Sequence, residues 1–141
     1  MWPKTYAARL RAWADLRTRM KEQPVDLALL EIHCWWSQTP WRPFYLHWDD
    51  RLNWPDPWQL LADNIYCDLA RALGMLYTVL MLDRQDCSDA VLAQTEQGNL
   101  VLVQQGKYIM NWIPDKIVNI ASQEPKIKTV LEPDVLELLT G

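Results

Sequence analysis

Three cysteines and two histidines are the residues of this chain most suited to nucleophilic or metal chemistry. The cysteines, Cys34, Cys67 and Cys87, are odd in number, widely spaced and without a Cys-x-x-Cys pair. A disulfide framework or a zinc ribbon needs closely paired cysteines, so neither is indicated. A thiol nucleophile in a protein that folds in a reducing compartment fits this pattern better.

Both histidines, His33 and His47, precede Cys67 in the chain. His33 with Cys34, or His47 with Asp49 and Asp50, could be written as a metal site or as part of a Cys–His pair. Neighbouring residues on a helix point about 100° apart, so His33 and Cys34 cannot readily share one ion. We therefore expect no metal and no cofactor. A Cys67–His47 pair stays open, because order in the sequence does not decide which side chains meet in space.

The elements around Cys67 indicate helices followed by an antiparallel sheet. Asp56-Pro57 is typical of a helix start, and the apolar spacing predicts a helix from there to residue 73, with Gly74 as its left-handed cap. The apolar run 75–82 predicts a buried strand. Further strands are expected at 90–93, 100–103, 108–113 and 127–131, with a turn at 104–106 and short helices at 115–121 and 134–139. The fold class is therefore α+β.

The N-terminal part is predicted to be helical, and a tryptophan-rich loop follows it. Apolar residues recur at helical spacing over 3–21 and from Pro24 to Trp36. Six of the nine tryptophans then lie between Trp35 and Trp58, interleaved with prolines that exclude a regular helix. With 141 residues we expect one domain: a helical hairpin over 1–36, a Trp/Pro-rich loop over 37–58, and a helix-plus-sheet core over 59–141.

The cysteine-bearing segment resembles the transglutaminase-like family of cysteine enzymes, whose fold packs a cysteine-bearing helix on a small antiparallel sheet. The segments that carry the resemblance are Trp54–Leu61, Cys67–Ala70 and Ala72–Met75. The family places a histidine and an aspartate on the strands that follow. Here Asn99 and Asn111 stand at those positions, and Tyr66 replaces the usual glycine before the cysteine. An amide cannot accept a thiol proton, so the resemblance implies vestigial triad positions (Cys67, Asn99, Asn111) and no catalysis.

The chain also resembles uncharacterised proteins of tailed bacteriophages, in segments such as Leu46–Asp50 and Asn99–Val103. That resemblance implies a non-catalytic structural component of the virion, in the tail, baseplate or neck, assembled in the host cytoplasm. Its partners would be other virion proteins, with several copies in one assembly. The alternative is an active cysteine hydrolase or transamidase that uses Cys67 with His47.

Charge and hydropathy exclude some classes of partner. Fourteen basic and 18 acidic residues give a net charge of −4, which offers little attraction for a phosphate backbone, so no direct nucleic-acid binding is expected. The longest uncharged apolar run, 73–82, is too short to span a membrane.

The tryptophan cluster has two main interpretations. In the first, the indoles form a small internal core that seals the sheet, because aromatic rings bury large areas. In the second, they form an anchor surface for protein partners, in which Trp and Arg supply most of the binding energy. The anchors expected in that case are Trp41, Arg42, Trp48 and Arg51. Carbohydrate binding by exposed indoles is a third interpretation.

Overall fold

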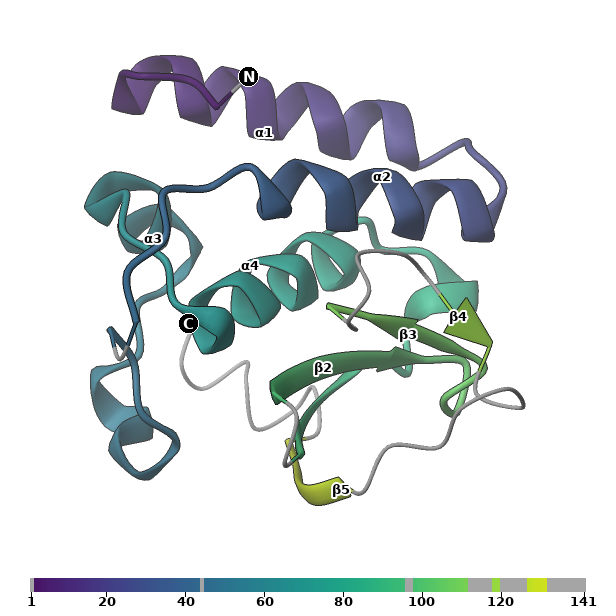
Figure 1. The fold of residues 1–141 in the computed structure, drawn as a ribbon. Helices are drawn as coiled ribbons and strands as arrows, with labels where there is room; N and C mark the ends of the chain where they lie inside the picture. The colour runs from purple at the N-terminus through teal and green to yellow at the C-terminus, as the bar shows by residue number, and fades with distance from the viewer. Residues whose placement is uncertain (1, 44, 96–97, 112–117, 120–126, 132–141) are drawn as a thin grey trace.

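The structure is a computed structural model that describes residues 2–43, 45–95, 98–111, 118–119 and 127–131. A helical layer lies on one face of a five-stranded antiparallel sheet (Figure 1). The helices are α1 (Tyr6–Met20), α2 (Val25–Ser37), α3 (Pro57–Asp63) and α4 (Asp68–Met81), with short 3-10 turns η1 (Trp48–Asn53) and η2 (Gln85–Cys87). This arrangement confirms the predicted α+β class.

The first two helices form where the sequence predicts them. The Thr5 side chain caps α1 by accepting a hydrogen bond from the Ala8 amide at 3.1 Å, and Pro24 precedes α2. Arg9 on α1 is buried although it is charged. Its Nε donates to the Leu61 carbonyl at 2.7 Å, so this cation fixes α1 on α3. No described helix is long and apolar enough to cross a membrane.

The single helix predicted from residue 57 to residue 73 is wrong, because the chain forms two helices there. Asp56 caps α3 as predicted, accepting from the Gln59 amide at 2.8 Å. Asn64 then adopts a left-handed conformation with φ 55°, which ends α3 at Asp63. A second helix, α4, begins at Asp68 with Cys67 as its N-cap residue. Asn tolerates the left-handed region better than most residues, and this break places Cys67 at a helix terminus.

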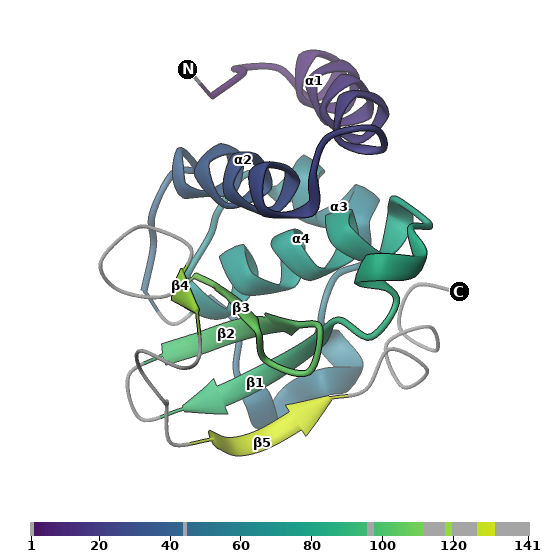
Figure 2. The same ribbon diagram turned by 90° about the vertical axis from the view of Figure 1, so that its right-hand side faces the viewer.

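The predicted strand over 75–82 is also wrong, because α4 continues through it to Met81. Figure 2 shows α4 between α2 and the sheet, and the run from Leu69 to Val79 is almost entirely buried. A helix enclosed on all sides has no polar face, so its sequence looks like that of a buried strand. Gly74 is therefore no helix stop: a Cβ there would lie 2.6 Å from the Trp36 ring, which needs the space.

The sheet has the order β4-β3-β2-β1-β5, so β2 lies at its centre. The strands are β1 (Val91–Thr95), β2 (Gly98–Val103), β3 (Tyr108–Met110), β4 (Val118–Asn119) and β5 (Ile127–Leu131). The predicted turn between β2 and β3 is confirmed, with left-handed residues at Gln104, Gln105 and Gly106. The predicted strand over 108–113 ends earlier, at Met110. Residues 118–119 are extended rather than helical, and the expected helix over 134–139 lies outside the described residues.

A buried threonine joins the helices of the upper layer. The indole nitrogens of Trp13 on α1 and Trp36 on α2 both donate to the Thr78 hydroxyl on α4, at 2.8 and 2.9 Å. Thr78 in turn donates to the Gly74 carbonyl at 2.7 Å. The internal-core interpretation thus holds for part of the tryptophan set: Trp13, Trp36 and Trp54 are buried, whereas Trp41 and Trp58 are exposed.

The central position of β2 predicts that it tolerates no charge. All four residues from Leu100 to Val103 are buried, which confirms the expectation of a strand covered on both faces. A Leu102→Asp variant should lose about 3 kcal/mol or more and fail to unfold cooperatively in urea. Leu52→Asp, at a side chain that is 94% exposed, is the matched control and should unfold like the parent. A stable Leu102→Asp protein would contradict this description of the sheet.

The contact between Gly74 and Trp36 leads to a second prediction, in which alanine lowers the stability of the protein instead of raising it. Replacing glycine by alanine inside a helix ordinarily stabilises by about 1 kcal/mol. Here the added methyl would collide with the Trp36 ring, so Gly74→Ala should instead destabilise by about 1–3 kcal/mol. Denaturant unfolding followed by tryptophan fluorescence measures the difference, and a gain in stability would show that Trp36 is not held against α4.

Candidate active site

Cys67 lies at the N-terminus of α4, under the loop that connects α2 to α3. It is the N-cap residue of the helix, and its carbonyl accepts from the Arg71 amide at 3.0 Å. Its thiol is buried, and the backbone amide of Leu46 donates to Sγ at 3.3 Å. Helix N-termini stabilise negative charge, so this is a suitable place for a thiolate nucleophile.

The two strand positions singled out by the sequence meet beside Cys67, on the carboxylate of Asp68. One carboxylate oxygen, Oδ2, accepts from the Asn99 amide at 2.6 Å and from Asn99 Nδ2 at 2.9 Å. The other, Oδ1, accepts from Asn111 Nδ2 at 3.0 Å. Asn111 Nδ2 also lies 2.7 Å from the Asn99 carbonyl, which closes the network. The structure therefore brings Cys67, Asn99 and Asn111 to one end of α4.

Sequence reasoning did not assign a role to Asp68. The available signal was an acidic residue directly after the cysteine, in the first turn of the helix, where a negative charge is favourable. Its pairing with two asparagines from β2 and the end of β3 depends on tertiary packing. That packing cannot be read from residue spacing.

His33 contacts the same network from α2. Its imidazole is buried, and Nδ1 accepts from the Asn111 backbone amide at 3.1 Å. Asn111 adopts a left-handed conformation with φ 64°, which turns its amide toward α2. His33 thus supports the end of β3, while the next residue, Cys34, is exposed. No group of three or more residues able to hold a metal occurs in the part of the chain that the structure describes.

The segment from Tyr45 to Trp54, here called the strap, lies beside Cys67 and Asn99. The Trp48 indole donates to Asn99 Oδ1, and the Trp54 indole donates to the His47 carbonyl at 2.8 Å. Tyr45 donates to the Asp63 carboxylate, and its burial together with that contact raises the pKa of its hydroxyl, so it stays a neutral donor. Several hydrogen bonds therefore hold the strap at the site.

His47 is placed between the two strap residues that touch the site. Leu46 contacts Cys67 and Trp48 contacts Asn99, whereas the His47 side chain is exposed. Its backbone is extended, with φ −130° and ψ 140°. Within the described residues, its imidazole forms no hydrogen bond with Sγ.

The four expected anchor residues have different surroundings. Trp41 is 54% exposed, and the Arg71 guanidinium lies over its ring at 4.9 Å. Arg42 and Arg51 are exposed, but Trp48 is half-buried and belongs to the strap. The surface available to a partner therefore centres on Trp41 and Arg42.

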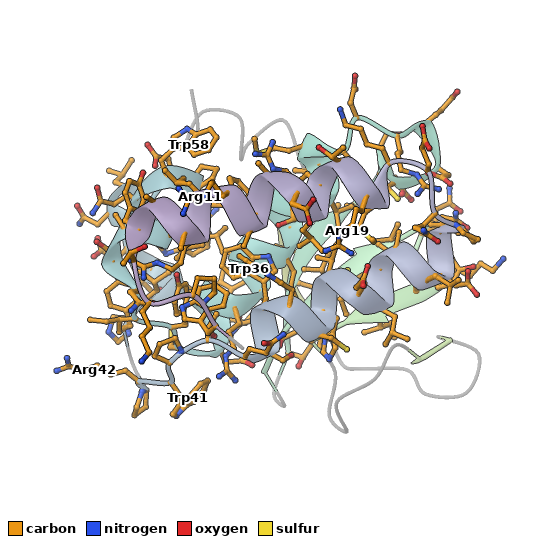
Figure 3. All side chains as sticks on the ribbon, turned by 90° about the horizontal axis from the view of Figure 1, so that it is seen from above. Arg11, Arg19, Trp36, Trp41, Arg42 and Trp58 are labelled. Carbon is orange, nitrogen blue, oxygen red and sulfur yellow. The ribbon has the colours of Figure 1, made fainter. Side chains whose placement is uncertain are left out.

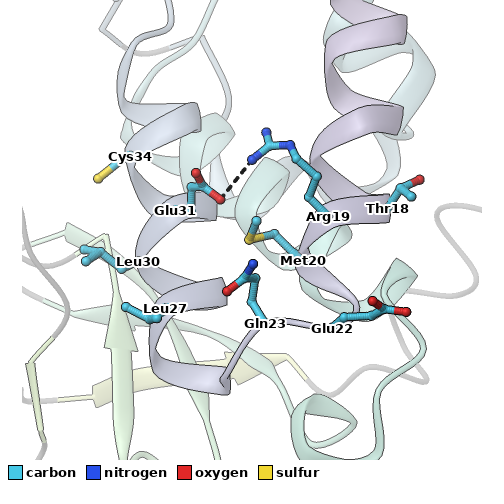
Figure 4. Close-up of a pocket in the computed structure, with 9 residues that line it drawn as sticks. All are labelled: Thr18, Arg19, Met20, Glu22, Gln23, Leu27, Leu30, Glu31 and Cys34. Carbon is cyan, nitrogen blue, oxygen red and sulfur yellow. Dashed lines mark hydrogen bonds and ion pairs between the residues drawn. The ribbon is translucent and has the colours of Figure 1, made fainter.

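A separate groove lies between α1 and α2 and has a volume of about 590 Å³ (Figure 4). Arg19 and Glu31 form an ion pair across it at 3.2 Å. Its lining includes Cys34, together with Leu27 and Leu30, and no histidine among the described residues. Cys67, in contrast, lies at a helix N-terminus beside the strap that carries His47, so it is the better candidate for catalysis.

Comparison with known proteins identifies the fold. The sequence matches no known family model and no curated protein sequence. Among the solved structures that are similar are two of LapG from Legionella pneumophila. The first has a TM-score of 0.74 at 14% identity, covering 99% of this chain and 87% of LapG. The second, of EGTA-treated LapG, has a TM-score of 0.75 at 13% identity, covering 99% of this chain and 90% of LapG.

These neighbours correct several expectations. LapG is a bacterial periplasmic cysteine protease, and nothing in the comparisons indicates a bacteriophage protein. The expectations of a non-catalytic virion component, of a protein that is no enzyme, and of localisation in a virion assembled in the host cytoplasm are therefore wrong. The virion expectations rested on a resemblance in short segments, which is weaker than a match of fold over nearly the whole chain. The expectation of no catalysis rested on the amides of Asn99 and Asn111. The expected fold is confirmed: the chain has the transglutaminase-like fold of LapG.

Proposed function

We propose that this protein is a cysteine hydrolase or transamidase in which Cys67 is the nucleophile and His47 the general base. The observation that carries the proposal is the hydrogen bond from the Leu46 amide to Cys67 Sγ. It ties the strap to the thiol one residue before the only histidine on that strap. Similarity to LapG, a cysteine protease, supports peptides or proteins as substrates.

Each half of the reaction requires two proton transfers. His47 removes the proton from the thiol, and the sulfur attacks the substrate carbonyl carbon. As the C–N bond breaks, the imidazolium gives this proton to the leaving amine, and a thioester on Cys67 remains. His47 then removes a proton from water, or from an amine in a transamidation, as that molecule attacks the thioester. The C–S bond breaks, and the imidazolium returns a proton to the sulfur, which regenerates the thiol.

The strap is the proposed source of the base because the two strand positions carry amides. Asn99 and Asn111 are occupied as donors to Asp68, and neither can accept a thiol proton. His33 already accepts a hydrogen bond from the Asn111 amide. The His47 side chain is exposed, and in the proposed mechanism it turns toward Sγ when substrate binds.

Thiol reactivity tests the proposed nucleophile. Iodoacetamide labelling at neutral pH, read by mass spectrometry, should modify Cys67 faster than Cys34, although Cys34 is the exposed thiol. Cys87 should stay unmodified, because burial raises the pKa of its thiol to about 12. Faster labelling of Cys34 than of Cys67 would remove the main support for an activated nucleophile.

Hydrolysis of unfolded casein tests the catalytic pair. Cys67→Ser should abolish cleavage, and His47→Gln should lower kcat by about 10²-fold or more, since general base catalysis contributes factors of that size. Cys34→Ser is the matched thiol control. Equal activity of His47→Gln and the parent would exclude His47 as the base, and full activity of Cys67→Ser would exclude the mechanism.

The Asp68 network should matter for both stability and reactivity. Asp68→Ala leaves donors of Asn99 and Asn111 without their acceptor, and we expect it to cost about 2 kcal/mol more than Asp26→Ala. Asp26 is the matched control, because it is an exposed acid in the first turn of α2. Urea unfolding gives the difference. The Cys67 labelling rate should also fall in Asp68→Ala alone, and identical behaviour of the two variants would show that the network does not position the site.

A further inference from the structure

We infer that Trp54 is a positioning residue, whose indole holds the backbone of His47 beside Cys67 so that the imidazole needs only a side-chain rotation to act. The inference rests on the proposed function, because it concerns the base of that reaction. It adds a residue on which the base depends. It requires that Trp54 be anchored in the core, that its indole bind the His47 backbone, and that the neighbours of His47 be held at the site.

Trp54 is anchored in the protein core at the end of the strap. Its side chain is buried and belongs to the main cluster of buried apolar residues. The next residue is held from α4, because the Tyr77 hydroxyl donates to the Pro55 carbonyl at 2.7 Å. Tyr77 is itself buried, and this burial raises the pKa of its hydroxyl, so that it stays a donor. The end of the strap is therefore attached to the buried helix α4.

The Trp54 indole binds the backbone of His47. Its Nε1 donates to the His47 carbonyl at 2.8 Å. The same oxygen accepts from the Asp50 amide at 3.2 Å, but that bond lies within the exposed turn η1. The Trp54 ring also packs edge-on against Trp48, with centroids 5.5 Å apart. The bond from Trp54 thus joins the His47 backbone to the core of the protein.

The residues on either side of His47 are held at the site. The Leu46 amide donates to Sγ of the nucleophile at 3.3 Å, and the Trp48 indole donates to Asn99 Oδ1. The His47 backbone is therefore held at its own carbonyl and through both neighbours, and rotation about side-chain bonds is what its imidazole retains. A base with fewer bonds to order loses less entropy in reaching a reactive geometry.

A purely structural role for Trp54 predicts a different outcome from a positioning role. If Trp54 only stabilised the fold, its loss would lower the free energy of unfolding and leave kcat of the folded protein unchanged. If Trp54 acts through His47, its loss lowers kcat only while His47 is present, because residues that act as a unit have non-additive effects. A double-mutant cycle therefore separates the two roles.

The test is such a cycle on casein hydrolysis, with Trp54→Phe and His47→Gln. Phenylalanine keeps an aromatic ring in the core but has no N–H to donate to the His47 carbonyl. In the parent background, Trp54→Phe should lower kcat by about tenfold and change KM by less than about twofold. In the His47→Gln background, it should lower kcat no further.

Trp13→Phe is the matched control. It also removes one buried indole N–H, which donates to the Thr78 hydroxyl at 2.8 Å. Trp13 packs edge-on against Trp36 within the helical layer, which Figure 3 shows from above, and it has no bond to the strap among the described residues. Trp13→Phe should therefore lower stability in urea and leave kcat unchanged.

Tyr77→Phe is the second variant, and it carries the test if Trp54→Phe does not fold. It removes only the hydroxyl that holds the end of the strap. It should lower kcat by a smaller factor than Trp54→Phe, with KM unchanged, and again have no effect in the His47→Gln background. Urea unfolding shows which variants are folded under the assay conditions.

The outcomes distinguish this inference from the proposed function. An unchanged kcat in folded Trp54→Phe, or an equal loss of kcat with and without His47, would overturn the inference and leave the proposed function intact. Full activity of His47→Gln would overturn both, because Trp54 would then have no base to position.

Discussion

The geometry of the site depends on the hydrogen bonds that the Asp68 carboxylate accepts. It sits in the first turn of α4 and accepts hydrogen bonds from Asn99 at the start of β2 and from Asn111 beyond β3. One side chain thus joins the helix that carries the nucleophile to two strands of the sheet. Hydrogen bonds to a charged group are stronger than those between neutral groups. These three bonds therefore define how Cys67 lies relative to β2 and β3.

A second polar centre lies toward the C-terminal end of α4. The hydroxyl of Thr78 accepts from two indoles, those of Trp13 and Trp36, and so fixes α1 and α2 on the buried helix. Gly74, one turn earlier, leaves room for the Trp36 ring. The unusual tryptophan content is explained in part by this packing, because large rings with a polar nitrogen can fill the space and still satisfy a buried hydroxyl.

Local signals in the sequence predict much of the fold and little of the site. The cap at Asp56-Pro57, the left-handed turn before β3 and the buried strand β2 all depend on neighbouring residues, and each is confirmed. The helical nature of 75–81 was missed because a fully enclosed helix loses its amphipathic pattern. The break at Asn64 and the role of Asp68 were missed because tertiary packing selects them.

Structural support and the proposed proton transfer at the site belong to different side chains. Asn99 and Asn111 both donate to the Asp68 carboxylate through amides, which do not change protonation at physiological pH. In the proposed mechanism the Asp68 network supports the site, whereas proton transfer falls to His47 on the strap, which lies between one residue bound to Cys67 and another bound to Asn99. Substrate binding would then bring His47 and Cys67 together, so that binding and activation are coupled.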